Sequence, residues 1–266
     1  MTIMNSRSLS FLSEATLLSA ILLLPFAATG QVNTEAMRRS DLTPGFHRQA
    51  SLTFTYQDGN SEFSKLATGL RLDLVRPTVY GFLVAKYDWG EEAQEKFLNK
   101  GFAHLRGIFQ RHLWWRPELF AQMEFNQFID LERRALAGGG LRMQAIDRVA
   151  ADSSGRRLSA QVGVGAMFEQ ERLDNVAETQ ETVRSTNYLS LVWQVDKRTS
   201  LQFISYYQVS LETFRDYRII GEGNLAVYLT DRIGLTTAVN LRYNNVPPTG
   251  VETTDIEISN GITVRF

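Results

Sequence analysis

The sequence predicts an all-β fold, a transmembrane antiparallel up-and-down β-barrel of about 12 strands. Three observations predict it. Apolar and polar residues alternate through most of the chain after residue 46, the N-terminus has the pattern of an export signal, and the last strand ends at an aromatic residue, Phe266. Because successive side chains of a strand point to opposite faces, this alternation gives each strand one apolar and one polar face.

The N-terminus is predicted to be a signal peptide. Arg7 supplies a positive charge, and residues 15–28 form an apolar stretch that is too short to span a bilayer but suits a signal-peptide core. The small residues Ala28 and Gly30 predict cleavage before Gln31, whereas a buried helix is the alternative. The predicted division of the chain is a signal peptide at 1–30, a periplasmic lead-in at 31–46 and the barrel at 47–266.

The alternation predicts one strand after another along the barrel segment. In the first, Leu52 and Phe54 lie on one face and Thr53 and Thr55 lie on the other. The predicted strands cover residues 47–56, 65–74, 78–87, 101–111, 118–131, 134–147, 158–168, 189–195, 201–211, 219–229, 233–243 and 254–266. An even number of strands brings both termini to the same side, as bacterial barrels require.

The last predicted strand carries the strongest signal. Ile256, Ile258, Ile262 and Val264 share one face, the other face is polar, and the strand stops at Phe266. Bacterial outer-membrane barrels commonly end this way, so Phe266 is predicted to be a C-terminal insertion signal for the barrel-assembly machinery. A soluble sheet that happens to end in Phe is the alternative.

The connections support this assignment because short ones alternate with long ones. Short turns are predicted at 76–77, 113–116, 196–198 and 230–232, and long polar loops at 88–98, 169–186 and 244–253. Short periplasmic turns and longer external loops are typical of outer-membrane barrels. Two connections on the predicted external side, at 57–60 and near residue 131, are short and break the rule.

Aromatic residues are expected to gather at the two membrane interfaces. Trp114 and Trp115 fall at one predicted turn, whereas Tyr56, Tyr87 and Tyr243 fall near the opposite strand ends. A lipocalin-like barrel or a soluble sandwich is the alternative fold, but these bury their apolar face inward.

The composition excludes several classes of protein. A net charge of -1 indicates no surface for nucleic acid, and the absence of Cys excludes disulfides and thiolate zinc sites. The mean hydropathy of -0.19 is too low for a helical membrane protein but suits a barrel with a polar interior. We expect no cofactor and no metal, and outer-membrane lipid of a Gram-negative bacterium as the partner. The oligomeric state is left open.

If the apolar faces meet lipid, the charged residues of the other parity line the lumen. These are Lys65, Arg71, Asp73, Lys86, Arg106, Glu124, Asp130, Arg142, Arg218, Glu222, Arg242 and Glu257, with Glu169, Asp196, Glu212, Arg232 and Arg265 on the same side. The two signs nearly balance, which indicates salt bridges across the lumen and a narrow or closed channel. The alternative is that some of these groups lie at strand ends in water.

Large and small residues also bear on the width of the bore. Arg106, Phe120, Phe128 and Tyr206 are large side chains predicted to point inward. The glycines at 138–140 are predicted to let a bulky lumen residue from a neighbouring strand pack closely, because no phosphate-binding pattern accompanies them.

The sequence does not indicate an enzyme. It has three His, no G-x-S-x-G elbow and no cluster with metal-ligand spacing. An outer-membrane hydrolase centred on His104 is one alternative function, and a surface adhesin that uses the loops at 88–98, 169–186 and 244–253 is another.

Two segments carry a resemblance to a known family. Residues 51–61, with 66–72 after them, resemble the first hairpin of salt-induced outer membrane proteins, which are bacterial barrels with a domain of unknown function. Residues 125–134 and 137–141 resemble the middle hairpin of that family, whereas 173–184 depart from it. The resemblance covers about 40–266. It implies a location and a link to salt or osmotic stress, but no substrate and no catalytic residue. The resulting prediction is a narrow or gated solute channel, or a barrel that stabilises the envelope.

Overall fold

The computed structural model describes residues 37–264 except 40–41, 60–61, 93–94, 111–113, 152–154, 175, 177 and 248–251. The predicted signal peptide and Phe266 lie outside the described residues. In the part of the chain that is described, no helix is long and apolar enough to cross a membrane.

The predicted all-β, up-and-down topology is confirmed. The strands are β1 (Gly45–Gln57), β2 (Phe63–Arg76), β3 (Val79–Glu92), β4 (Glu95–Phe109), β5 (Trp115–Asn126), β6 (Leu131–Val149), β7 (Arg157–Leu173), β8 (Gln180–Gln194), β9 (Thr199–Ser210), β10 (Tyr217–Tyr228), β11 (Ile233–Asn244) and β12 (Thr254–Val264). They form one 12-stranded sheet in sequence order, and every ladder is antiparallel. A short 3-10 turn, η1 (Gln127–Ile129), joins β5 to β6.

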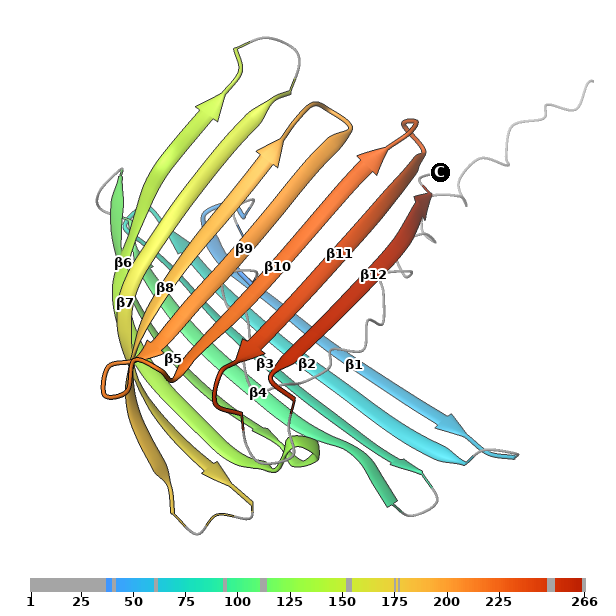
Figure 1. The fold of residues 1–266 in the computed structure, drawn as a ribbon. Helices are drawn as coiled ribbons and strands as arrows, with labels where there is room; N and C mark the ends of the chain where they lie inside the picture. Colours follow the sequence, from blue (N-terminus) through green and yellow to red (C-terminus); the bar gives the residue numbers. More distant parts are fainter. Residues whose placement is uncertain are drawn as a thin grey trace, which may run out of the picture.

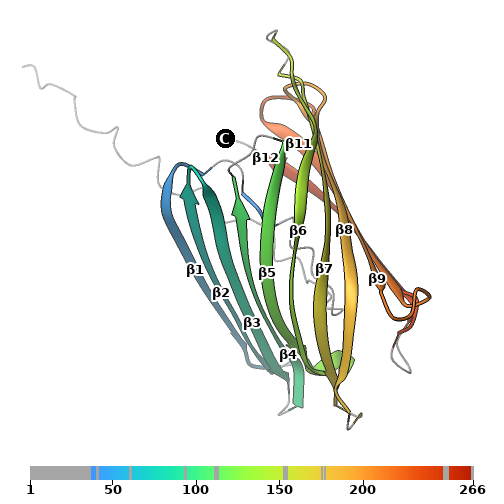
Figure 2. The ribbon, with the colours of Figure 1, turned by 90° about the vertical axis from the view of Figure 1, so that its left-hand side faces the viewer.

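The sheet is strongly curled, so that β1–β5 face β8–β12 across a common interior (Figures 1 and 2). The register explains the curl, because each strand is displaced along its neighbour. A line through paired residues that starts at Gly45, the first residue of β1, crosses every ladder from β1–β2 to β10–β11 and reaches Asn244, the last residue of β11. Such a stagger accompanies the strand tilt of barrels. No ladder joins β1 to β12 among the described residues, so these two strands are the edges of the sheet.

Two of the predicted long loops are wrong. β3 continues to Glu92 and β4 begins at Glu95, where a loop at 88–98 was expected. Likewise β7 continues to Leu173 and β8 begins at Gln180 within the expected loop at 169–186. Ladder hydrogen bonds join backbone groups, so polar strands can pair where no apolar face has to be covered. The predicted loop at 244–253 is confirmed, since β11 ends at Asn244 and β12 begins at Thr254.

The two faces of the sheet differ sharply in polarity. The convex face carries exposed apolar side chains such as Leu105 and Leu119, which are 55% and 60% exposed. The concave face buries charged side chains such as Arg134 and Arg142, which are 2% and 1% exposed. A soluble β-sheet protein has the opposite arrangement, with its apolar face in the core.

Glycines on the concave face make room for large side chains, and of the glycines at 138–140 this holds for Gly138. A Cβ on Gly138 would lie 2.7 Å from Cζ of Phe120 on the adjacent strand β5. Gly163 on β7 lies directly beneath the ring of Tyr188 on β8. These glycines therefore allow aromatic side chains to lie flat against the sheet.

Candidate functional site

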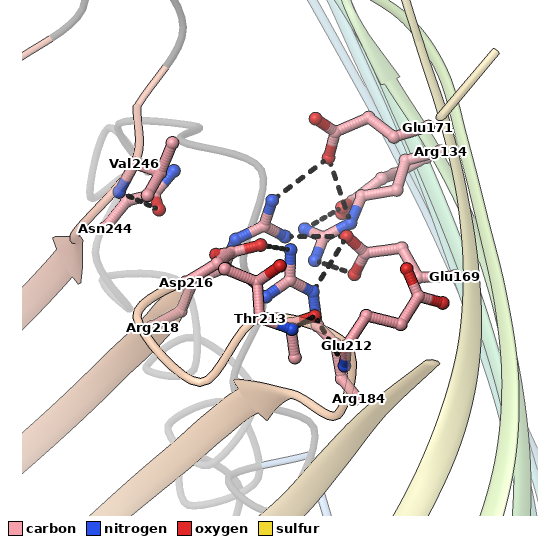
Figure 3. A network of polar contacts seen from close by, with 12 residues as sticks. Arg134, Glu169, Glu171, Arg184, Glu212, Thr213, Asp216, Arg218, Asn244 and Val246 are labelled. Atoms are coloured by element: carbon pink, nitrogen blue, oxygen red, sulfur yellow. Dashed lines mark hydrogen bonds and ion pairs between the residues drawn. The ribbon is translucent and has the colours of Figure 1, made fainter. Parts of the chain in front are cut away.

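The most connected residue of the concave face is Glu169 on β7, whose carboxylate accepts hydrogen bonds from three arginines (Figure 3). The donors are Arg134 Nη2 on β6 at 2.6 Å, Arg184 Nε on β8 at 3.3 Å and Arg218 Nη1 on β10 at 2.9 Å. β8 and β9 separate β10 from β7 in the sheet, so the bond from Arg218 crosses the interior.

Three further carboxylates complete this cluster. Glu124 accepts from Arg134 at 3.0 Å, Glu171 accepts from Arg218 at 3.5 Å, and Asp216 accepts two bonds from Arg184 at 3.0 and 2.7 Å. We call the set the mouth network; its members are Glu124, Arg134, Glu169, Glu171, Arg184, Asp216 and Arg218. Asp216 belongs to the connection between β9 and β10, so the network ties that connection to the interior of the sheet (Figure 3).

The mouth network continues to a buried histidine. Gln122 Nε2 donates to Glu124 Oε2 at 3.3 Å, and Gln122 Oε1 lies 3.1 Å from His104 Nδ1. Only the amide NH₂ can donate to a carboxylate, so the amide oxygen accepts from His104 and places the imidazole proton on Nδ1. An unbroken chain of hydrogen bonds thus runs from β4 to β10 across the concave face.

A cavity of about 20 Å³ lies beside His104. It is lined by side chains of every strand from β4 to β10, including Arg106, Tyr206 and Gln208, so the two halves of the curled sheet meet here. His104 Nε2 and Gln208 Oε1 are buried without a hydrogen-bond partner among the described residues. The volume suits roughly one water molecule, and a solute does not fit without movement of these side chains.

Two smaller clusters occupy other levels of the concave face. Arg142 on β6 donates to the hydroxyl of Tyr188 at 3.1 Å and to the side chain of Gln161. Nearer to the termini, Arg71 makes two bonds of 2.7 Å to Asp73. Each buried arginine therefore has polar partners, which burial of a charge requires.

The structure brings together most of the predicted lumen residues. The buried or largely buried ones are Arg71, Asp73, Arg106, Glu124, Arg142, Glu169 and Arg218. By strand register the same face carries Lys65, Lys86, Glu222, Arg242 and Glu257, which are partly or fully exposed. Of the large side chains expected inside, Arg106, Phe120 and Tyr206 line the cavity, as predicted.

Five predicted inward residues lie outside the strands. Asp196, Glu212 and Arg232 lie in the connections that follow β8, β9 and β10, and Arg265 lies outside the described residues. Asp130 follows η1 in the left-handed conformation with a φ of 54° and is exposed. Phe128 lies within η1 and is 47% exposed. The side chain of Asn126 accepts a hydrogen bond from the backbone of Phe128 and caps this turn, so the strand ends before both residues.

Sequence reasoning missed several members of the network. Arg134 has the parity of Arg142 on the same strand, and this signal was sufficient to place it inside. Arg184 and Asp216 had no such signal, because Arg184 fell within a predicted loop and Asp216 lies between strands. Within the described residues no group of His, Cys, Asp or Glu is arranged to hold a metal ion.

Comparison with known proteins adds one finding. The model of the family described as "Protein of unknown function, DUF481" matches residues 50–266. No curated protein matches the sequence significantly. The matched region includes all residues of the mouth network, the cavity and the clusters around Arg142 and Arg71.

Proposed function

We propose that this chain, which belongs to the DUF481 family, is an outer-membrane β-barrel whose concave face lines a narrow, gated passage for small solutes. One observation carries the proposal, namely the inverted polarity of the sheet. Its convex face exposes a belt of apolar side chains, while its concave face buries arginines and carboxylates.

The apolar belt favours lipid as the solvent of the convex face. Exposed apolar residues on neighbouring strands include Leu70, Leu105, Leu119, Met123, Leu141, Val164 and Leu189. In water such a continuous patch promotes aggregation, whereas hydrocarbon solvates it. About 10 residues of tilted strand cross a bilayer, and the shortest strand here, β12, has 11 residues.

Aromatic residues border the belt at both ends, as membrane interfaces favour. Tyr207, Tyr217 and Tyr243 form a row across β9, β10 and β11, with ring centroids 5.9 and 5.7 Å apart. At the other end, Trp114 and Trp115 lie 6.3 Å apart beside the connection between β4 and β5. The row of tyrosines lies on the side of the β9–β10 connection, which we assign to the cell exterior.

Closure of the sheet through β1 and β12 is part of the proposal. Free strand edges leave backbone N–H and C=O groups without partners, and hydrocarbon offers none. Antiparallel pairing of the two edge strands places their apolar side chains on the same, convex face, with Leu52 and Phe54 of β1 beside Ile256 and Ile258 of β12. The stagger of the sheet favours this pairing, because from β1 to β11 the strands are already displaced along one another by about a full strand length.

Cysteine cross-linking tests closure, since the natural chain contains no Cys. Ser51→Cys is combined in turn with Glu257→Cys, Ser259→Cys and Gly261→Cys, and the protein is oxidised in lipid vesicles. One of the three pairs is expected to form a disulfide. If none of them does while Ser51→Cys with Gly69→Cys, at directly paired positions, cross-links, closure is contradicted.

Conductance across planar bilayers tests the passage. The filled interior around the cavity predicts small, infrequent steps in the natural protein and larger ones after Tyr206→Ala, which removes a buried ring from the cavity wall. The same filled interior supports a second candidate, a closed barrel that stabilises the envelope. Absence of conductance from both proteins favours this second candidate. The link to salt stress stays a prediction.

A further inference from the structure

Two buried apolar clusters interrupt the polar concave face, and one of them contains Tyr188, Ile204, Tyr206 and Ile220, close to the cavity. Tyr80, Phe82 and Val84 of β3 and Ile108 of β4 form the other, near the end of the sheet where β1 begins. All four are at most 5% exposed. Apolar side chains that face a polar interior need an apolar cover to be excluded from water.

The cover comes from the segment that precedes β1. Met37 and Leu42 pack against the cluster together with Val75 and Phe102. Met37 and Leu42 therefore lie inside the curl, against its concave face. We call residues 37–39 and 42–44 the strap, and the cluster of Tyr80, Phe82, Val84 and Ile108 its seat.

Hydrogen bonds attach the strap at both of its ends. The backbone N–H of Arg39 donates to the hydroxyl of Tyr80 at 3.2 Å, and Arg39 Nη2 donates to Gln49 Oε1 at 2.9 Å. Further along, the carbonyl of Thr43 lies 2.8 Å from His47 Nε2. The strap is thus held by apolar packing and by three polar contacts.

The seat itself is oriented by an ion pair. The hydroxyl of Tyr80 donates to Asp73 Oδ1 at 2.8 Å while it accepts from Arg39. Asp73 is in turn held by two bonds of 2.7 Å from Arg71. Because Tyr80 uses its donor on Asp73, its oxygen acts as an acceptor, both for the backbone N–H of Arg39 in the strap and for Arg71 Nη2 at 3.4 Å.

We propose that the strap is a plug that docks on this seat and closes the end of the passage nearest the termini. The strap takes no part in the strand ladders, so it can leave without breaking the sheet. Closing a passage rests on the function proposed above, whereas docking on the seat does not.

Thiol labelling tests docking without reference to transport. Val84→Cys places a thiol within the seat, and its reaction with a water-soluble maleimide is followed in the folded protein. Leu42→Asp puts a charge on the strap's apolar contact and is expected to accelerate labelling roughly tenfold, the effect of about 1.4 kcal/mol on the opening equilibrium. The matched control is Val176→Asp, which adds the same charge at an exposed site in the β7–β8 connection. Equal labelling rates in the Leu42→Asp and control proteins overturn docking.

Trypsin gives a second test on a chain with a natural seat, in case Val84→Cys does not fold. Cleavage after Arg38 and Arg39 is expected to be slow in the natural protein and fast with Leu42→Asp. Equal cleavage rates again overturn docking.

Conductance then tests the plug. Leu42→Asp is expected to raise the open probability in planar bilayers relative to Val176→Asp. If Leu42→Asp accelerates labelling but has the same open probability as Val176→Asp, closure of the passage by the strap is overturned. No conductance in any variant contradicts the proposed passage, while labelling and cleavage still decide docking.

Discussion

Glu169 and Arg218 lie 2.9 Å apart, although the strands that carry them, β7 and β10, are separated by two others in the sheet. The contact is possible only because the sheet curls enough to bring the concave sides of these strands together. Both side chains are buried, at 2% and 7% exposure. The pair therefore links the curvature of the sheet to the electrostatics of its interior.

The first prediction is that Glu169→Gln destabilises the protein. The substitution keeps the size of the side chain but removes the charge that three buried arginines share, which leaves positive charge uncompensated. We expect the free energy of unfolding to fall by about 3 kcal/mol, measured by urea denaturation in lipid vesicles. The matched control is Glu181→Gln, which alters an exposed carboxylate bonded only to Gln170 in the described contacts. A change below about 0.5 kcal/mol for both variants would contradict the central role of Glu169.

A double-mutant cycle forms the second prediction. Glu169→Gln and Arg218→Gln are expected to be coupled. Each single substitution leaves the charge of the other residue without its partner, whereas the double substitution removes both charges. The coupling free energy should be about 1–3 kcal/mol from the four unfolding free energies. Strictly additive effects would show that the bond across the interior contributes nothing to stability.

Gly163→Ala is the third prediction. The ring of Tyr188 covers this glycine so closely that a methyl group has no room, and the ring would have to leave Arg142 as well. We expect a loss of about 1–3 kcal/mol in the free energy of unfolding. Gly223→Ala is the control, because no heavy atom lies within 4 Å of its added Cβ. Similar losses at both positions would mean that strand flexibility, and not the ring, makes glycine necessary.

Alternation of side chains was sufficient to predict the number, order and faces of the strands. It failed where strands extend beyond the apolar belt, as at Glu92 and Gln180, because backbone pairing there needs no apolar face. Strand β3 shows a second limit. Phe82 and Val84 are as apolar as Leu83 and Ala85 on the opposite face, so the pattern alone does not reveal the seat of the strap.

The candidate site was predictable in composition but not in connectivity. The parity of Glu124, Glu169 and Arg218 places them on the same face of the sheet, as expected from the sequence, and this is the concave face. That Arg218 reaches Glu169 depends on the stagger of many ladders, which no local pattern contains. The inward position of Arg184 was not predicted, because its strand was expected to begin only at residue 189, whereas β8 begins at Gln180.

The fourth prediction concerns pH and the turn between β8 and β9. Asp196 accepts backbone hydrogen bonds from Arg198 and Thr199, each at 2.7 Å, and these lower the pKa of its carboxyl group. A lowered pKa means that the stabilisation is present above the ordinary value near 3.8 and is lost as the pH falls through the folded-state value. We expect Asp196→Asn to unfold more easily than the natural protein at pH 7, and the difference between the two proteins to shrink as the pH falls below 3.8. A difference that persists unchanged at low pH would contradict an ionic origin.

The fifth prediction separates lipid from water as the solvent of the convex face. Leu105 lies within β4, opposite Leu83 and Ala121 of the neighbouring strands, and is 55% exposed. In a bilayer, Leu105→Arg places a charge in the apolar belt and is expected to lower the free energy of unfolding in vesicles by about 3 kcal/mol. On a water-exposed surface the same change stays within about 0.5 kcal/mol. Val176→Arg, in the connection between β7 and β8, is the matched control and should have little effect in either case. If both arginines prove equally harmless, the membrane assignment fails, because a guanidinium group in the middle of the belt has no partner to offset its transfer into hydrocarbon.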